Sequence, residues 1–177
     1  MSARSIPCSD PSNVIITQGE YALGRRPDKV ISTILGSCVA VCLWDAEAGV
    51  GGMNHILLPN DGGGLGAVSF GASDMERLMN ALLKVGAMRS RLTAKAFGGA
   101  SIVSGLSDIG AKNAEFVRAF LRTESIPCLG ESLGGTRARQ IRFWPHSGRV
   151  QHRFVGMSEV IAPVKPAPRA NGVELFG

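Results

Sequence analysis

The stretch Val39-Ala40-Val41-Cys42-Leu43-Trp44 is a continuous apolar run, and Cys38 stands directly before it. A second apolar run, at residues 53–58, contains His55. The segment between the two runs, residues 45–52, is polar and rich in glycine. Short apolar runs joined by such a segment are typical of a β-hairpin. We therefore expect the strands of Cys38 and His55 to lie side by side.

A thiol beside an imidazole can act as a nucleophile and its base. The thiolate is the reactive form of cysteine, and a neighbouring protonated imidazole stabilises it. The small pair Gly36-Ser37 comes immediately before Cys38, and backbone N–H groups at this pair could hold a developing oxyanion. The sequence thus predicts Cys38 as the nucleophile and His55 as the base, with Gly36 and Ser37 at the oxyanion position.

Two other interpretations compete for these residues. Free cysteine is usually a small core residue, but Cys38 follows Gly-Ser instead of lying inside the apolar run, which favours the nucleophile. A zinc site made of Cys38, Cys42 and a histidine is disfavoured, because C-x-x-x-C on a strand lacks the spacing of structural zinc sites and the sequence has no second close pair. We expect Cys42 to be a packing residue, and neither a metal nor an organic cofactor to be needed.

Length and composition are those of one ordinary domain. The chain has 177 residues, of which 45% are hydrophobic, and this is enough for a substantial core. No apolar run of about 18 residues occurs, so we expect a protein that is not embedded in a membrane. The N-terminus has no apolar signal core, which favours a cytoplasmic location with the four cysteines as thiols.

The net charge of +5 arises from 19 basic and 14 acidic residues that are scattered along the chain. Few aromatic residues are available to stack on bases, and no nucleic-acid-binding motif is present. We therefore expect no nucleic-acid partner. His146, His152, Arg137 and Arg139 lie in or near a late hairpin, where we expect solvent-exposed positions.

Strand and helix patterns follow one another between residues 13 and 156. The expected strands cover residues 14–16, 30–35, 92–97, 140–144 and 149–155. Apolar residues at helical spacing predict helices over 71–86 and 109–122. Together they predict an α+β fold in a single domain over 13–156. We expect a flexible N-terminus at 1–12 and a proline-rich, flexible C-terminal tail at 157–177.

Six motifs occur in order over most of the chain. They are Gly19-Glu20-Tyr21-Ala22, Ser32-Thr33-Ile34-Leu35-Gly36-Ser37-Cys38-Val39-Ala40-Val41-Cys42, Gly51-Gly52-Met53-Asn54-His55-Ile56-Leu57-Leu58-Pro59, Phe97-Gly98-Gly99-Ala100-Ser101, Ile109-Gly110-Ala111-Lys112-Asn113 and Gly134-Gly135-Thr136-Arg137-Ala138-Arg139. In this combination the sequence resembles the CheD family of chemoreceptor glutamine deamidases.

The resemblance implies a layered α/β/β domain with mixed sheets and two main helices. It implies a hydrolase of bacterial chemotaxis, a protein-glutamine glutaminase that converts glutamine side chains of methyl-accepting chemotaxis receptors to glutamate without a cofactor. It also implies a third catalytic residue, a Thr or Ser hydroxyl. The spacing to Cys38 indicates Ser32, with the adjacent Thr33 as the alternative. Strand alternation places Ser32, and not Thr33, on the face of Cys38.

Other functions are compatible with the same residues. The chain could be a regulatory binding module for a CheC-like phosphatase, a partner that the resemblance implies, with little catalysis of its own. It could hydrolyse small amides by the same thiol chemistry. A glutamate methyl ester is a further substrate for that chemistry, because it differs from the amide only in the leaving group.

Overall fold

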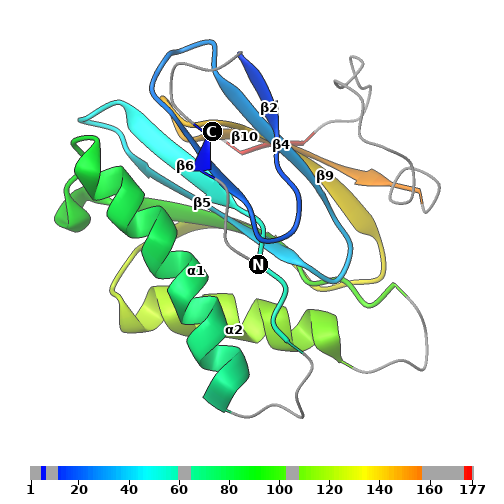
Figure 1. Ribbon diagram of the computed structural model, residues 1–177. Coiled ribbons are helices and arrows are strands. Elements are labelled where there is room, and N and C mark those ends of the chain that lie inside the picture. The colour runs from blue at the N-terminus through cyan, green and yellow to red at the C-terminus, as the bar shows by residue number, and fades with distance from the viewer. Residues whose placement is uncertain (1–4, 7–11, 60–64, 103–107, 157–173, 177) are drawn as a thin grey trace.

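The computed structural model describes residues 5–6, 12–59, 65–102, 108–156 and 174–176. Two helices and two β-sheets form three layers, with the helices on the outer face of the first sheet and the second sheet behind it (Figure 1). The expected α+β fold, with its layered α/β/β arrangement and two main helices, is confirmed. Most of the two terminal segments that we expect to be flexible lies outside the described residues, so the domain limits stay a prediction.

The first sheet has six strands in the order β1-β3-β6-β5-β7-β8. Their bounds are β1 Ser5–Ile6, β3 Tyr21–Gly24, β5 Val39–Asp45, β6 Val50–Asn54, β7 Thr93–Gly98 and β8 Cys128–Leu133. β5 and β6 form the expected antiparallel hairpin, in which Cys42 pairs with Met53. Its second strand was expected at residues 53–58 but begins at Val50, inside the expected loop, and ends before His55. The sheet is mixed, because β1 runs parallel to β3 and β7 runs parallel to β8.

The second sheet has five strands in the order β11-β10-β9-β4-β2. Their bounds are β2 Asn13–Ile15, β4 Val30–Leu35, β9 Ala138–Trp144, β10 Arg149–Val155 and β11 Glu174–Phe176. β9 and β10 are the expected late hairpin, and β4 pairs antiparallel with β9. This pairing places β4 in a different sheet from β5, although only three residues separate the two strands.

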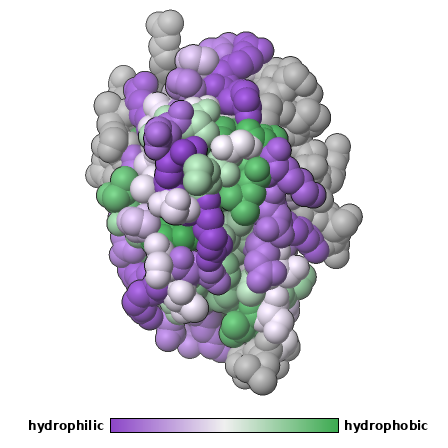
Figure 2. Space-filling view, turned by 90° about the vertical axis from the view of Figure 1, so that its left-hand side faces the viewer, coloured by the Kyte–Doolittle hydropathy of each residue, from purple (hydrophilic) through white to green (hydrophobic). Residues whose placement is uncertain are grey.

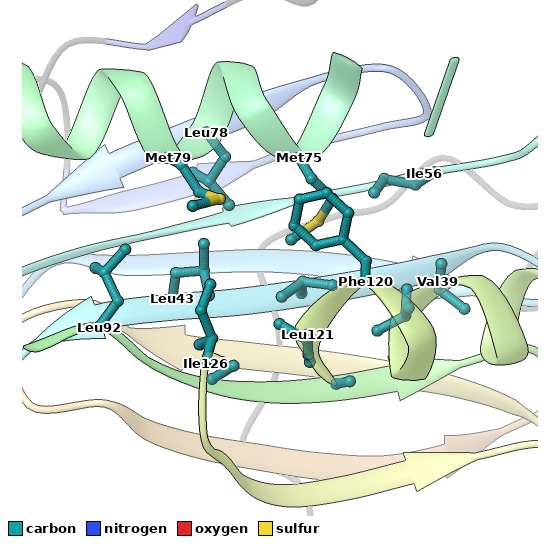
Figure 3. Close-up of a cluster of buried hydrophobic side chains, with 14 of the residues drawn as sticks. Val39, Leu43, Ile56, Met75, Leu78, Met79, Leu92, Phe120, Leu121 and Ile126 are labelled. Carbon is teal, nitrogen blue, oxygen red and sulfur yellow. The ribbon is translucent and has the colours of Figure 1, made fainter. Parts of the chain in front are cut away.

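Two helices cover the first sheet: α1 (Leu65–Lys84) and α2 (Ile109–Thr123). A short 3-10 helix, Arg89–Arg91, follows α1. The hydrophobic cluster between helices and sheet includes Leu43, Met75 and Phe120 (Figure 3). α2 agrees with the sequence-based expectation, whereas α1 begins six residues before the expected start.

Strand β5 contributes to two hydrophobic cores. Val39, Val41 and Leu43 pack on the helix side, while Ala40 and Cys42 pack between the two sheets. Both faces of the strand are therefore buried, and a strand buried on both faces reads as a continuous apolar run instead of an alternating one. Residues 39–44 form a continuous apolar run for this reason.

Four strands in the described part of the chain were not predicted from the sequence. β1 and β11 lie within the two terminal segments that were expected to be flexible. β3 is short, and its last residue, Gly24, begins a segment with the composition of a turn. β8 lies at an edge of the first sheet and has no fully buried residue, so its sequence lacks the apolar pattern of an inner strand.

Large hydrophobic side chains on the surface are few in the described part of the chain. The exposed ones are Val68, Phe70, Leu83, Met88, Leu129 and Phe154. On the face shown in Figure 2, hydrophobic residues form small separate patches among hydrophilic ones. None of the described helices has both the length and the apolar character that a membrane span requires.

Candidate active site

Cys38 lies in the short link between the two sheets, and hydrogen bonds hold the carbonyl groups of this link in place. Ala100 N–H donates to Gly36 O (3.0 Å), and Gly99 N–H donates to Cys38 O (2.8 Å). The Asn113 side-chain amide donates to Ser37 O (2.8 Å). Within the described residues, the N–H groups of Ser37 and Cys38 have no backbone acceptor in a neighbouring element. The oxyanion position that the sequence predicts at Gly36 and Ser37 falls on this link.

The segment that holds Cys38 requires a glycine at position 98. Gly98 has φ +108°, and a Cβ at this position would lie 2.2 Å from Cys38 O. A side chain there would collide with the backbone of Cys38 and would also be strained by the positive φ. The end of β7 can approach the cysteine this closely only because residue 98 is glycine.

His55 directly follows β6, and its neighbour Ile56 pairs with Val39. The two residues exchange backbone hydrogen bonds of 2.9 and 2.7 Å. Val39 and Ile56 point toward the helices (Figure 3), so alternation directs Cys38 and His55 to the opposite face, between the two sheets. In this register Cys38 is the diagonal neighbour of His55, a relationship that separates Cα atoms by about 7–8 Å. Among the described residues, no hydrogen bond joins the two side chains.

Thr33 contacts His55 from the second sheet. Its Oγ1 donates to Ile16 O (2.8 Å) and lies 2.8 Å from His55 Nδ1. A hydroxyl has one hydrogen. Because that hydrogen is donated to a carbonyl, the hydroxyl accepts from an Nδ1–H of the imidazole. The neutral ring then carries its lone pair on Nε2, so this contact selects the tautomer in which Nε2 can take up a proton.

The expectation that Ser32 would face His55 through strand parity with Cys38 does not hold. Ile31 and Leu35, which share a strand face with Thr33, belong to the core between the sheets, so Ser32 points to the other face of β4. Strand parity does not extend to Cys38, because β4 and β5 lie in different sheets and the chain turns at residues 36–38. The structure brings Thr33, the adjacent alternative, to His55.

Burial disfavours the charged form of both candidate catalytic groups. It raises the pKa of the Cys38 thiol to about 11. It lowers the pKa of His55 to about 4, against the opposing effect of the Glu20 carboxylate. These directions favour a neutral pair in the free protein over the thiolate and protonated imidazole expected from the sequence, because burial disfavours the charged form of each group. The proton of Cys38 would have to move when the thiol attacks.

Other residues singled out in the sequence lie away from this pair. Cys42 is fully buried, and burial strongly raises the pKa of its thiol, as expected for a packing residue. His146 is exposed, as expected. His152 and Arg139 were expected on the surface, but their exposed fractions are 1% and 3%. This expectation is wrong because the inner face of the late hairpin packs on the first sheet.

Arg139 supports the site from a distance. Its guanidinium donates to Gly98 O (3.2 Å), Gly134 O (2.7 Å) and the Ser132 hydroxyl (3.0 Å). These bonds hold the end of β7, which in turn holds Cys38. The spacing of Arg137 and Arg139 indicates that both side chains lie on one face of a strand. It does not indicate whether that face is exposed to solvent or packs against the other sheet.

Sequence reasoning also did not assign a role to Asn113. This residue is fully buried on α2, and its side chain contacts backbone on both sides of the site. It lines a cavity of about 380 Å³ between α1 and α2, together with Leu58 and Phe116. The only available signal was its place in the Ile109-Gly110-Ala111-Lys112-Asn113 motif.

A metal site would need several ligands close together. Among the described residues, no group of three or more His, Cys, Asp or Glu side chains is placed to hold an ion.

Comparisons with known proteins agree with the motifs. The model of the family described as CheD chemotactic sensory transduction matches residues 57–154. A protein of Caulobacter vibrioides named "Probable chemoreceptor glutamine deamidase CheD" is 47% identical, over 94% of this chain and 96% of its own length. A protein of the same name from Caulobacter sp. is 50% identical, over 92% of each chain.

A solved structure, that of the Bacillus licheniformis hypothetical protein YfiH, aligns with a TM-score of 0.43 at 16% sequence identity. The alignment covers 63% of this chain and 49%, about half, of that protein.

Proposed function

The chain belongs to the CheD family, and from this premise we propose that it is a chemoreceptor glutamine deamidase with Cys38 as its nucleophile. The substrate is a glutamine side chain on a chemotaxis receptor, and the products are glutamate and ammonia. One observation supports the assignment most strongly: Thr33 orients His55 through Nδ1 (2.8 Å), on the sheet face to which Cys38 also points.

The proposed reaction begins with attack of Cys38 Sγ on the carboxamide carbon of glutamine. As the S–C bond forms, the thiol proton passes to His55 Nε2. The carbonyl oxygen becomes an oxyanion, and the N–H groups of Ser37 and Cys38 are available to stabilise it. When the C–N bond breaks, the nitrogen takes the proton from His55 and leaves as ammonia, so a thioester remains.

Water completes the cycle. His55 Nε2 accepts a proton from a water molecule as its oxygen attacks the thioester carbon, and the thiol leaves with that proton. The glutamine has then become glutamate, and both side chains return to their starting protonation states. Because both begin neutral, proton transfer and nucleophilic attack belong to the same step. Thr33 holds the imidazole in the required tautomer throughout, as an orienting residue does in a catalytic triad.

We further propose that the protein acts in the cytoplasm, where the signalling domains of receptors are accessible and where Cys38 stays reduced. A CheC-like phosphatase is a second proposed partner, and it rests on the family resemblance alone. Co-purification of the two proteins, with and without receptor fragment, tests it. A complex that forms equally well with Cys38→Ala and does not change the deamidation rate would favour the binding-module alternative.

The decisive experiment incubates the protein with a cytoplasmic receptor fragment. Ammonia release and peptide mass spectrometry of the fragment should show specific glutamines converted to glutamate. Cys38→Ala should leave them unchanged. Turnover of free glutamine amides but not of the receptor would support the small-amide alternative, and loss of methanol from a methylated fragment would reveal ester hydrolysis. If Cys38→Ala kept the wild-type rate, the proposed mechanism would be wrong.

A further inference from the structure

Asn113 connects the two backbone segments that carry the proposed catalytic pair. Its Nδ2 donates to Ser37 O (2.8 Å), one residue before Cys38. Its Oδ1 accepts from Leu58 N–H (3.1 Å), three residues after His55. Both ends of one side-chain amide are therefore used, each on a different segment of the site.

Asn113 contacts the two segments from the helix side of the first sheet, which is the side away from the catalytic side chains. Asn113 belongs to α2, on the helix side of the first sheet, whereas Cys38 and His55 point between the sheets. The amide therefore meets the backbone of the two segments and not the reacting atoms. The Val39–Ile56 bridge also joins the two segments. The Asn113 amide adds a second connection beside this bridge, between Ser37 and Leu58, where, among the described residues, the two segments no longer pair with each other directly.

The position of α2 makes this connection possible. A Cβ on Gly110 would lie 2.3 Å from Ala100 O, so the first turn of α2 packs directly against the backbone that holds residues 36–38. Asn113 follows one turn later and is fully buried. A buried amide with both of its polar ends paired has a single favourable orientation.

We propose that Asn113 is a positioning residue that sets the distance and angle between Cys38 and His55 by clamping Ser37 to Leu58. The inference rests on the proposed function, in which the thiol must reach both the substrate carbon and His55 Nε2. Without the clamp, the Val39–Ile56 bridge still joins the two segments, but Ser37 and Leu58 lose their connection through the amide, so the link at residues 36–38 can shift relative to the segment after His55. Displacements on the order of 1 Å between reacting groups cost about 10- to 100-fold in rate.

The test compares Asn113→Ala and Asn113→Asp with Val117→Ala. Asn113→Asp keeps the size of the side chain and the acceptor for Leu58 N–H but loses the donor to Ser37 O, so it remains informative if Asn113→Ala does not fold. Val117 is the matched control, because it is fully buried one turn further along α2 and does not contact residues 36–38 through a hydrogen bond. Each variant is assayed well below its own Tm.

Two readouts are measured: kcat and KM for a receptor fragment, and the rate at which iodoacetamide alkylates Cys38 in the free protein, followed by peptide mass spectrometry. We expect both Asn113 variants to lose about 10- to 100-fold in kcat, with KM within about threefold, and to change the alkylation rate of Cys38. Val117→Ala should lower Tm and leave kcat and alkylation near the wild-type values.

A kcat within about twofold of wild type in a folded Asn113 variant would overturn the inference, as would an equal loss in Val117→Ala. Failure of the proposed function would give other results than failure of the positioning role. The wild type itself would not deamidate the receptor, or Cys38→Ala would remain active. The alkylation rates still decide the positioning role in that case, because they need no substrate. Unchanged alkylation in the Asn113 variants would then count against it.

Discussion

Thr33 and His55 meet across the two sheets: the Thr33 hydroxyl donates to Ile16 O and lies 2.8 Å from His55 Nδ1. The same hydroxyl group thus contacts the backbone of the second sheet and the imidazole. Thr33 as a whole is 1% exposed. The imidazole is oriented by a residue that lies 22 positions earlier in the chain. Orientation and tautomer are therefore consequences of how the sheets stack.

Thr33→Val removes the acceptor for Nδ1–H while keeping the shape of the side chain. We expect kcat for receptor deamidation to fall about tenfold, the scale of one hydrogen bond worth about 1.4 kcal/mol. Thr33→Ser should stay within a few-fold of wild type because it keeps the hydroxyl. Ser32→Ala serves as the neighbouring control and should be nearly neutral. A large loss in Ser32→Ala with none in Thr33→Val would reverse the assignment.

Cys38→Ala should abolish deamidation and leave the free energy of unfolding within about 1 kcal/mol of wild type, because the half-buried link keeps its backbone bonds. Denaturant unfolding and the receptor assay, run on the same sample, measure both quantities. Cys42→Ala is the matched control: it lies on the same strand face but is fully buried. It should lose stability through the cavity and still deamidate the receptor.

The pH dependence of Cys38 alkylation tests the neutral pair. With the pKa of the thiol at about 11 and that of His55 at about 4, the rate in the free protein should be low at neutral pH and rise only toward about pH 11. Cys128 is exposed, so it should react earlier and provides an internal comparison within the same digest. Fast alkylation of Cys38 at pH 7, lost in His55→Ala, would instead demonstrate a preformed thiolate–imidazolium pair.

His55 should also make the protein less stable in acid. Its pKa in the folded state is about 4, below the value of about 6.5 in an unfolded chain. Between these values the unfolded chain binds a proton that the folded chain does not. The contribution of His55 to the free energy of unfolding is therefore fully present above about pH 6.5. It decreases by about 3 kcal/mol as the pH falls toward 4. Urea unfolding of wild type and His55→Gln at several pH values measures it; an equal pH dependence in the two proteins would contradict the prediction.

Gly98→Ala tests the close contact with Cys38. The new Cβ would meet Cys38 O at 2.2 Å, so we expect the cysteine link to shift, with a large loss of kcat and a stability loss of at least about 2 kcal/mol. Gly86→Ala is the control, because Gly86 has the same φ of +108° and open space around its Cβ position. Gly86→Ala therefore measures the effect of backbone strain alone, without a steric clash. Equal effects of the two substitutions would show that the contact with Cys38 is unimportant.

The sequence by itself determined the elements around the site. The continuous apolar run at residues 39–44 indicated a strand, and the glycine-rich segment after it indicated the hairpin that pairs β5 with β6. The stripe of apolar residues over 109–122 predicted α2 almost to the residue. These features follow from periodicity and turn chemistry, which act over a few residues and are visible in the chain itself.

Only the tertiary structure decided which hydroxyl meets His55, which charge states the pair adopts and which buried amide holds it. Ser32 and Thr33 differ by one step of strand alternation, and the choice between them depended on β4 joining the second sheet while β5 joined the first. The pKa values of Cys38 and His55 depend on burial between layers. Asn113 acts through contacts 76 and 55 positions away. Such relationships arise when layers pack, so local sequence patterns do not contain them.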